Sequence, residues 1–282
     1  MVTIISDSTC DLSEELLKRY DIDIIPLHVH LGEKEYLDGV NITPDEIYTW
    51  SDKNGATPKT SAPAIGDVED IYRKYLDAGN ELVVFTISAS MSSCINVCTL
   101  AAQELEAEDR VTVMDSANLS TGVGHLVIEA AILAAAGKSR SEIEQAVLNY
   151  RSKVRASFVV DTLVYLYRGG RCSGLAALAG SALKLHPRIV VENGAMHSDR
   201  KYRGSIGKAI LAYAKDLEPD LIKAKPDRVF ITHSGCDPQD VDAVRQYLQS
   251  LGHFNEILET RAGGVVSSHC GPGTLGVLFI EG

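Results

Sequence analysis

Short apolar runs alternate with amphipathic segments through the first half of the chain. Residues 2–5 are apolar and are followed by Ser6-Asp7-Ser8. Residues 12–20 then show helical spacing, with Ser13 as a favourable N-cap. Two more apolar runs, at residues 82–87 and 111–114, are each followed by a polar loop and a helical segment. A repeat of strand and helix in this order predicts a parallel sheet covered by helices.

Between the first two of these units the pattern is less regular. Residues 22–31 are typical of one extended stretch, and Gly32-Glu33 turns the chain back through Tyr36 to form a hairpin. Thr43-Pro44 indicates a helix start, with Thr as the N-cap and Pro at the first helical position. Residues 53–63 contain Gly, two Pro and several hydroxyls, and therefore predict a loop.

The pattern changes after Arg155, where we place a boundary between an N-terminal α/β domain, residues 1–155, and a C-terminal α/β domain, residues 156–282. A glycine-rich segment at 168–174 and the hairpin signal Glu192-Asn193-Gly194 mark the second part. The remaining predicted elements are helices at 126–136 and 141–154 in the first part, helices at 206–217 and 238–251 in the second, and strands at 228–232, 254–259 and 275–280.

Charge and composition exclude several classes of partner. Among the 282 residues, 27 Lys and Arg oppose 38 Asp and Glu, which gives a formal net charge of -11 and no basic stripe. Nucleic acid and anionic membranes are therefore not expected as partners. The longest apolar stretches, such as residues 126–136, fall well short of the roughly 20 residues that span a bilayer, so we expect no membrane segment and no signal peptide.

The six cysteines point to a reducing compartment. They lie at positions 10, 94, 98, 172, 236 and 270, and none forms a C-x-x-C pair. A chain of this length does not need disulfides to fold, so we expect free thiols and a cytoplasmic location.

Small polar residues follow each predicted strand, where open α/β sheets bind their ligands. The run from Ser88 to Ser93 precedes a helical segment, so its hydroxyls and backbone N–H groups suit a carboxylate or a phosphate. The sequence from Gly271 to Gly276 matches G-x-G-x-x-G, but no helix pattern follows it, and we reject a dinucleotide site. His28 and His30 share one strand face without a further ligand at a recognised spacing, which favours a solvated face over a metal site.

Seven motifs along the chain together carry a family resemblance. From Met1 to Gly282 the chain resembles the DegV family of bacterial fatty-acid-binding proteins. The motifs are Ser6-Asp7-Ser8, Thr60-Ser61-Ala62-Pro63, the serine-rich turn around Ser92, Asp115-Ser116, Gly169-Gly170-Arg171, Lys201-Tyr202-Arg203-Gly204 and His269-Cys270-Gly271-Pro272-Gly273.

The resemblance implies a two-domain α/β protein, with a parallel N-terminal sheet and a mixed C-terminal sheet, that holds one long-chain fatty acid between its domains. The residues that match the family's carboxylate-binding threonine and serine are Thr60 and Ser92. Arg171 and His269 match residues that the family uses for head-group support or for interaction with the kinase. The protein would be no enzyme and would need no metal or cofactor.

The resemblance also implies a partner. In the family, the bound acid is presented to a separate kinase related to dihydroxyacetone kinases, which makes the acyl phosphate. The arginine associated with kinase engagement matches Arg203, with Arg200 as the alternative. The chain departs from the family pattern at Ser93-Cys94, where Gly-Thr is usual, and at His186-Pro187, where Lys-Pro is common.

Two other classes of function remain open on the sequence. A serine hydrolase would use Ser92 as nucleophile, His269 as base and Asp115 as orienting residue, since we expect all three in polar loops. A regulatory or scaffold protein would use the same loops to bind a partner and no small molecule. The preferred acyl length, its unsaturation and the oligomeric state are not encoded in any motif.

Overall fold

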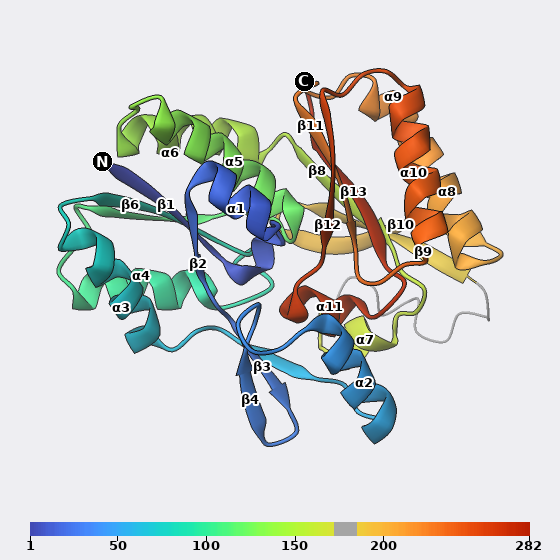
Figure 1. Ribbon diagram of the computed structural model, residues 1–282, viewed down its shortest axis with the longest axis horizontal. Coiled ribbons are helices and arrows are strands. Elements are labelled where there is room, and N and C mark those ends of the chain that lie inside the picture. The colour runs from blue at the N-terminus through green and yellow to red at the C-terminus, as the bar shows by residue number, and fades with distance from the viewer. Residues whose placement is uncertain (172–184) are drawn as a thin grey trace.

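A computed structural model describes residues 1–171 and 185–282 of the chain. It confirms the α/β class, with a parallel sheet in the N-terminal half and a mixed sheet in the C-terminal half (Figure 1). The predicted glycine-rich segment is described only as far as Arg171, so its residues 172–174, Cys172 included, lie outside the described residues. The proposed division at residue 155 stays a prediction.

The first sheet has the strand order β2-β1-β6-β7 and is parallel throughout. Successive residues of its strands face opposite layers, so that Ile4 belongs to one apolar cluster and Ile5 to another. Helices α3 and α4 cover one face, and α5 and α6 cover the other (Figure 1). The strands are β1 (Val2–Asp7), β2 (Ile22–Ile25), β6 (Glu81–Thr86) and β7 (Val111–Asp115); the helical segments are η1 (Ser8–Cys10), α1 (Glu14–Tyr20), α3 (Ile65–Leu76), α4 (Cys94–Glu104), α5 (Thr121–Ala135) and α6 (Arg140–Arg151).

A small antiparallel sheet, β4-β3-β5, projects from this half together with helix α2 (Pro44–Asn54). The hairpin of β3 (His28–Leu31) and β4 (Lys34–Leu37) is confirmed, as is the cap at Thr43, which forms a full capping box with Glu46. The prediction of a single extended stretch at 22–31 is wrong. Proline at position 26, which offers no N–H to a ladder, separates β2 in the first sheet from β3 in the small one.

The predicted loop at 53–63 is also corrected. It contains the end of α2 and a short strand, β5 (Lys59–Ser61), which pairs with β3 so that Thr60 lies opposite Val29. The sequence of this strand has no alternation of apolar and polar residues that would predict it. Its extended conformation depends on pairing with β3.

The second sheet has the order β10-β9-β8-β13-β11-β12. The predicted hairpin is confirmed: Asn193 and Gly194 both have positive φ, as a two-residue turn between twisted strands requires. Its strands are β8 (Val154–Val159), β9 (Leu185–Glu192), β10 (Ala195–Arg203), β11 (Arg228–His233), β12 (Glu256–Arg261) and β13 (Leu275–Ile280), with helices α7 (Val164–Arg168), α8 (Ile206–Asp216), α9 (Glu218–Leu221), α10 (Pro238–Ser250) and α11 (Gly264–Cys270).

Helix α5 joins the two halves. Its apolar side chains share one cluster with residues of β1 and of β13, and its Glu129 binds Arg228 of β11 at 2.8 Å in a buried ion pair. Removing one partner of such a pair leaves a buried charge uncompensated, so the contact holds the two sheets in one arrangement. Among the described helices, none is both long and apolar enough to cross a bilayer.

Candidate functional site

A cavity of about 280 Å³ lies between the small sheet, α7 and α11, close to the lower end of the volumes of small-molecule sites. Its wall is mostly apolar, and four of the five predicted site residues line it. Arg203 does not. The lining residues are Leu27, Thr60, Ser61, Ala62, Ile87, Met91, Ser92, Ser93, Leu119, Leu166, Arg171, Met196, Val265, Val266, His269 and Cys270.

A second, smaller cavity adjoins the first. The two share Leu119, Val266 and Cys270, and the second continues past Phe158 and Leu278 of the C-terminal sheet. The apolar wall therefore draws on both halves of the chain.

Thr60 and His269 are in direct contact. Thr60 Oγ1, on β5, lies 2.8 Å from Nε2 of His269, on α11. His269 is thus on a helix and not on the expected loop. Burial, together with the nearby charge of Arg171, lowers the pKa of His269 to about 4, so the ring is neutral at pH 7. With Nε2 protonated, the ring donates to Thr60 and leaves the threonine hydroxyl free to donate to a ligand.

Gly169 makes room for this histidine. A Cβ at Gly169 would lie 2.3 Å from Nδ1 of His269, so any larger residue would displace the ring. The carbonyl of Gly169 also accepts a hydrogen bond of 2.7 Å from the guanidinium of Arg171. The Gly-Gly-Arg motif therefore serves two purposes that the sequence did not reveal, space for an imidazole and an acceptor for the arginine.

Ser92 lies in the turn between β6 and α4. Its Oγ accepts the N–H of Cys94 at 3.3 Å and lies 3.0 Å from the thiol sulfur of the same residue. The amide occupies an acceptor position of the serine, so its hydroxyl hydrogen can point to a ligand. Cys94, one of the departures from the family pattern, thus contacts the predicted carboxylate-binding serine.

Only part of the serine-rich run faces the cavity. Ser88 donates to the carbonyl of Gly194 at 2.7 Å, and Ser90 donates to the same carbonyl. These two hydroxyls join the turn to the β9–β10 hairpin, while Ser92 and Ser93 line the cavity. An anion would meet two serines and not four.

The hydrolase arrangement is not assembled in the described residues. His269 contacts Thr60 and not Ser92, and Asp115 accepts the backbone N–H groups of Ala89 and Ala117 at 3.1 and 2.8 Å. A triad needs hydrogen bonds from nucleophile to base and from base to carboxylate. Neither bond occurs in residues 1–171 or 185–282.

The two candidate arginines differ in their environment. Arg200 forms an ion pair with Asp216. Arg203 is the last residue of β10, and its exposed guanidinium has no ion-pair or hydrogen-bond partner in the described part of the chain. His186, where the family often has lysine, is buried and hydrogen-bonded to the carbonyl of Gly204 at 3.1 Å.

The strand face with His28 and His30 is not solvated as expected. His28 is only 9% exposed and pairs with Glu35, while His30 contacts Ser61 Oγ at 2.9 Å. The described residues contain no group of three His, Cys, Asp or Glu arranged to hold a metal ion.

Comparisons with known proteins agree on one family. The family model described as "Uncharacterised protein, DegV family" matches residues 1–282. A DegV domain-containing protein of Clostridium perfringens is 31% identical over 281 residues, which is 99% of this chain and 98% of that protein.

Solved structures give the same result. A fatty-acid-binding DegV family protein from Thermus thermophilus is 33% identical with a TM-score of 0.91, and the match covers 99% of each chain. A stearic-acid-binding protein from Eubacterium ventriosum is 28% identical with a TM-score of 0.86, over 100% of this chain and 98% of that one. The chain therefore belongs to the DegV family.

Proposed function

We propose that this protein binds one long-chain fatty acid, with the carboxylate on the hydroxyls of Thr60 and Ser92 and the tail against the apolar wall. One observation carries the proposal: an apolar cavity lined by residues from both halves of the chain contains two hydroxyls. Ser92 Oγ accepts the N–H of Cys94, and Thr60 Oγ1 lies within hydrogen-bond distance of His269 Nε2. With His269 protonated at Nε2, both hydroxyls can donate, which suits an anion that can only accept.

The energetics favour such a ligand. Each buried CH2 contributes roughly 0.8 kcal/mol, so a tail of about 16 carbons more than offsets the cost of association. A charge-assisted hydrogen bond adds about 1.5 to 3 kcal/mol. The tail thus supplies most of the affinity, and the hydroxyls determine where the head group lies.

The relatives support the same ligand class. The Thermus thermophilus and Eubacterium ventriosum proteins bind fatty acids, the latter stearic acid, and both resemble this chain over almost its whole length. Arg171 and His269 are proposed as head-group residues because both line the cavity, and because His269 is hydrogen-bonded to Thr60.

A head-group comparison tests the proposal. Oleate and oleyl alcohol share a tail, so the ratio of their dissociation constants measures carboxylate recognition alone. We expect Thr60→Val and Ser92→Ala each to weaken oleate binding about tenfold, with little effect on the alcohol. Thr49→Val on α2 and Ser152→Ala beside α6 are matched controls outside the cavity. Equal loss for both ligands would place the carboxylate elsewhere.

We further propose that the protein does not itself turn over the acid but presents it to a separate, dihydroxyacetone-kinase-like kinase. There a carboxylate oxygen attacks the terminal phosphorus of ATP, which releases ADP and leaves an acyl phosphate. The meeting of two anions needs nearby cations. The exposed guanidinium of Arg203, unpaired among the described residues, supports a role at the kinase interface, whereas Asp216 already neutralises Arg200.

Parallel assays separate the two roles. Arg203→Ala should leave oleate affinity near normal and lower kinase-dependent acyl-phosphate formation. Arg73→Ala, at an exposed position on helix α3, should change neither. Normal acyl-phosphate formation with Arg203→Ala, together with reduced formation with Arg200→Ala, would assign the kinase contact to Arg200.

A further inference from the structure

Two carboxyl groups from the first part of the chain hold the start of helix α11. Asp11 accepts the N–H of Gly263 at 2.8 Å, and Asp38 accepts the N–H of Gly264 at 2.6 Å. A Cβ on Gly264 would lie 2.8 Å from the Asp38 oxygen. The consecutive glycines therefore let both carboxyls reach the backbone at the point where the helix begins.

Asp38 also reaches the wall of the cavity. Its second oxygen accepts the hydroxyl of Ser8 at 2.8 Å, and Ser8 Oγ in turn accepts the N–H of Leu27 at 3.2 Å. The backbone N–H of Asp38 donates to the carbonyl of Leu27 at 2.8 Å. Leu27 lines the cavity. The side chain of Asp38, which is 2% exposed, therefore connects the cavity wall to α11.

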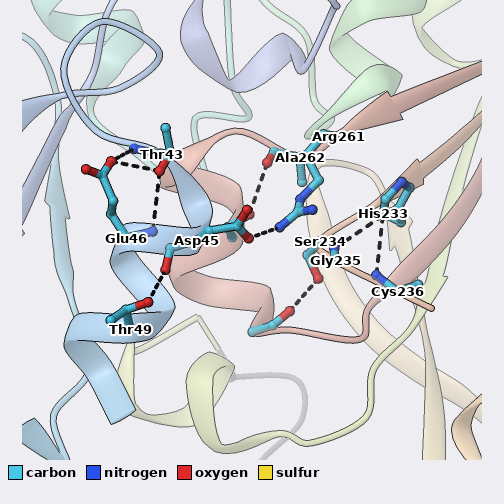
Figure 2. A network of polar contacts seen from close by, with 12 residues as sticks. Thr43, Asp45, Glu46, Thr49, His233, Ser234, Gly235, Cys236, Arg261 and Ala262 are labelled. Atoms are coloured by element: carbon cyan, nitrogen blue, oxygen red, sulfur yellow. Dashed lines mark hydrogen bonds and ion pairs between the residues drawn. The ribbon is translucent and has the colours of Figure 1, made fainter. Parts of the chain in front are cut away.

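The helix that Asp38 holds carries His269. Only seven residues long, α11 gains little stability from its own hydrogen bonds, and its position depends on contacts at its ends. A further polar contact near its start joins Arg261 to Asp45 of α2 at 2.6 Å (Figure 2), but it is exposed and hence weak. The buried bonds of Asp11 and Asp38 are therefore the stronger attachment.

Keeping these carboxyls buried is costly. Burial raises the pKa of Asp38 above its usual range and that of Asp11 to about 8, and the two repel each other when both are charged. Two apolar side chains would fill the same space without this cost, yet they could not accept the N–H groups of Gly263 and Gly264. The arrangement is explained if the position of α11 matters.

We infer that Asp38 is a positioning residue for carboxylate recognition: by holding the first turn of α11 against Ser8 and Leu27, it keeps His269 in contact with Thr60. This inference rests on the proposed function, because it assigns Asp38 to the head-group end of the same site. Asp38 does not line the cavity, and it acts through α11 without touching the ligand.

Two substitutions separate the acceptor from the charge. Asp38→Asn keeps an oxygen for Gly264 and removes the charge, whereas Asp38→Ala removes both oxygens. We expect Asp38→Ala to weaken oleate binding about tenfold and oleyl alcohol binding less than about twofold, and Asp38→Asn to stay close to wild type. An oleate-to-alcohol ratio unchanged in a folded Asp38→Ala variant would overturn the inference.

A spectroscopic signature reports the position of His269 directly. In nitrogen-15 NMR of the imidazole, assigned with His269→Gln, wild type and Asp38→Asn should show the neutral ring protonated at Nε2. Asp38→Ala should lose this preference. A purely structural role of Asp38 would lower the melting temperature and leave the spectrum unchanged.

Ser8→Ala provides a milder variant if Asp38→Ala does not fold. It removes the hydrogen bond to Asp38 and the acceptor of the Leu27 N–H from a partly exposed position. We expect about a threefold loss in oleate affinity with the same change in the His269 spectrum. An unchanged ratio in Ser8→Ala would contradict the inference. If wild-type protein itself does not prefer oleate to the alcohol, the proposed function fails, and the spectrum alone still decides whether Asp38 positions His269.

Discussion

Thr60 Oγ1 and His269 Nε2 lie 2.8 Å apart, although 209 positions separate the two residues in the chain. The threonine belongs to a strand of the small sheet and the histidine to a helix near the C-terminus. The contact therefore forms only when the two parts of the chain are assembled. We expect the neutral imidazole to turn the threonine hydroxyl toward the ligand.

His269 should act as a neutral donor. Its pKa, lowered to about 4 by burial and then by Arg171, leaves it uncharged throughout the neutral range. His269→Gln, which offers an N–H of similar reach, should keep most of the oleate affinity, and His269→Ala should lose about tenfold. Titrations of oleate between about pH 6 and pH 8 check this. A step present in wild type and missing from His269→Gln would show that the histidine titrates there.

Gly169 should tolerate no side chain. Its φ is ordinary, so Gly169→Ala would act only through the Cβ, which would lie 2.3 Å from Nδ1 of His269. We expect about a tenfold loss of oleate affinity through the displaced ring, measured by fluorescence competition. Gly66→Ala in α3 meets nothing within 4 Å and serves as the control, with unchanged binding. Normal affinity in Gly169→Ala would mean that His269 can move without consequence.

The stability of the fold should depend on the protonation of Asp11. Burial raises the pKa of this carboxyl from 3.8 to about 8. The folded state then holds the proton more tightly than the unfolded chain, so stability from this group is complete below about pH 4 and is lost as the pH rises through about 8. Asp11→Asn stays neutral, keeps an oxygen for Gly263 and suits the left-handed backbone at this position.

We therefore expect Asp11→Asn to gain stability over wild type between about pH 5 and pH 9, by at least about 1 kcal/mol in the free energy of unfolding. Urea unfolding at each pH measures this free energy for both proteins. Asp21→Asn is the matched control, because Asp21 has the same backbone conformation with an exposed side chain. A difference between wild type and Asp11→Asn that does not vary with pH would show that Asp11 keeps its ordinary pKa.

Ser92 should be inert as a nucleophile. Among the described residues it has no base within hydrogen-bond distance, since its polar contacts there are the backbone N–H and the thiol of Cys94. A fluorophosphonate probe should leave the protein unlabelled under conditions that label a serine esterase. Stoichiometric labelling that disappears in Ser92→Ala would restore the hydrolase alternative.

Local patterns predicted much of the fold. The caps at Ser13 and Thr43, the Asn193-Gly194 turn and the apolar strands depend on residues close together in the chain, and the structure confirms each of them. Resemblance to a family predicts a common site for Thr60, Ser92, Arg171 and His269, and all four line one cavity in the structure.

The elements that complete the site had no local signal. Strand β5 is extended only because β3 pairs with it, and α11 starts at two glycines whose partners, Asp11 and Asp38, lie more than 200 positions away. The pairing of the buried His28 with the exposed Glu35 depends in the same way on the folded hairpin. Such contacts combine segments that no periodicity connects.

Mass spectrometry of the purified protein is the sharpest test of fatty-acid binding. Protein produced in a bacterial host is measured intact under native conditions, and its lipids are then extracted with organic solvent and identified. We expect one long-chain fatty acid per chain, because an empty apolar cavity leaves apolar surface without packing contacts. We expect reduced occupancy in the Thr60→Val, Ser92→Ala double variant. Protein that carries no stoichiometric fatty acid, and takes up neither added oleate nor added palmitate, would contradict the proposed function.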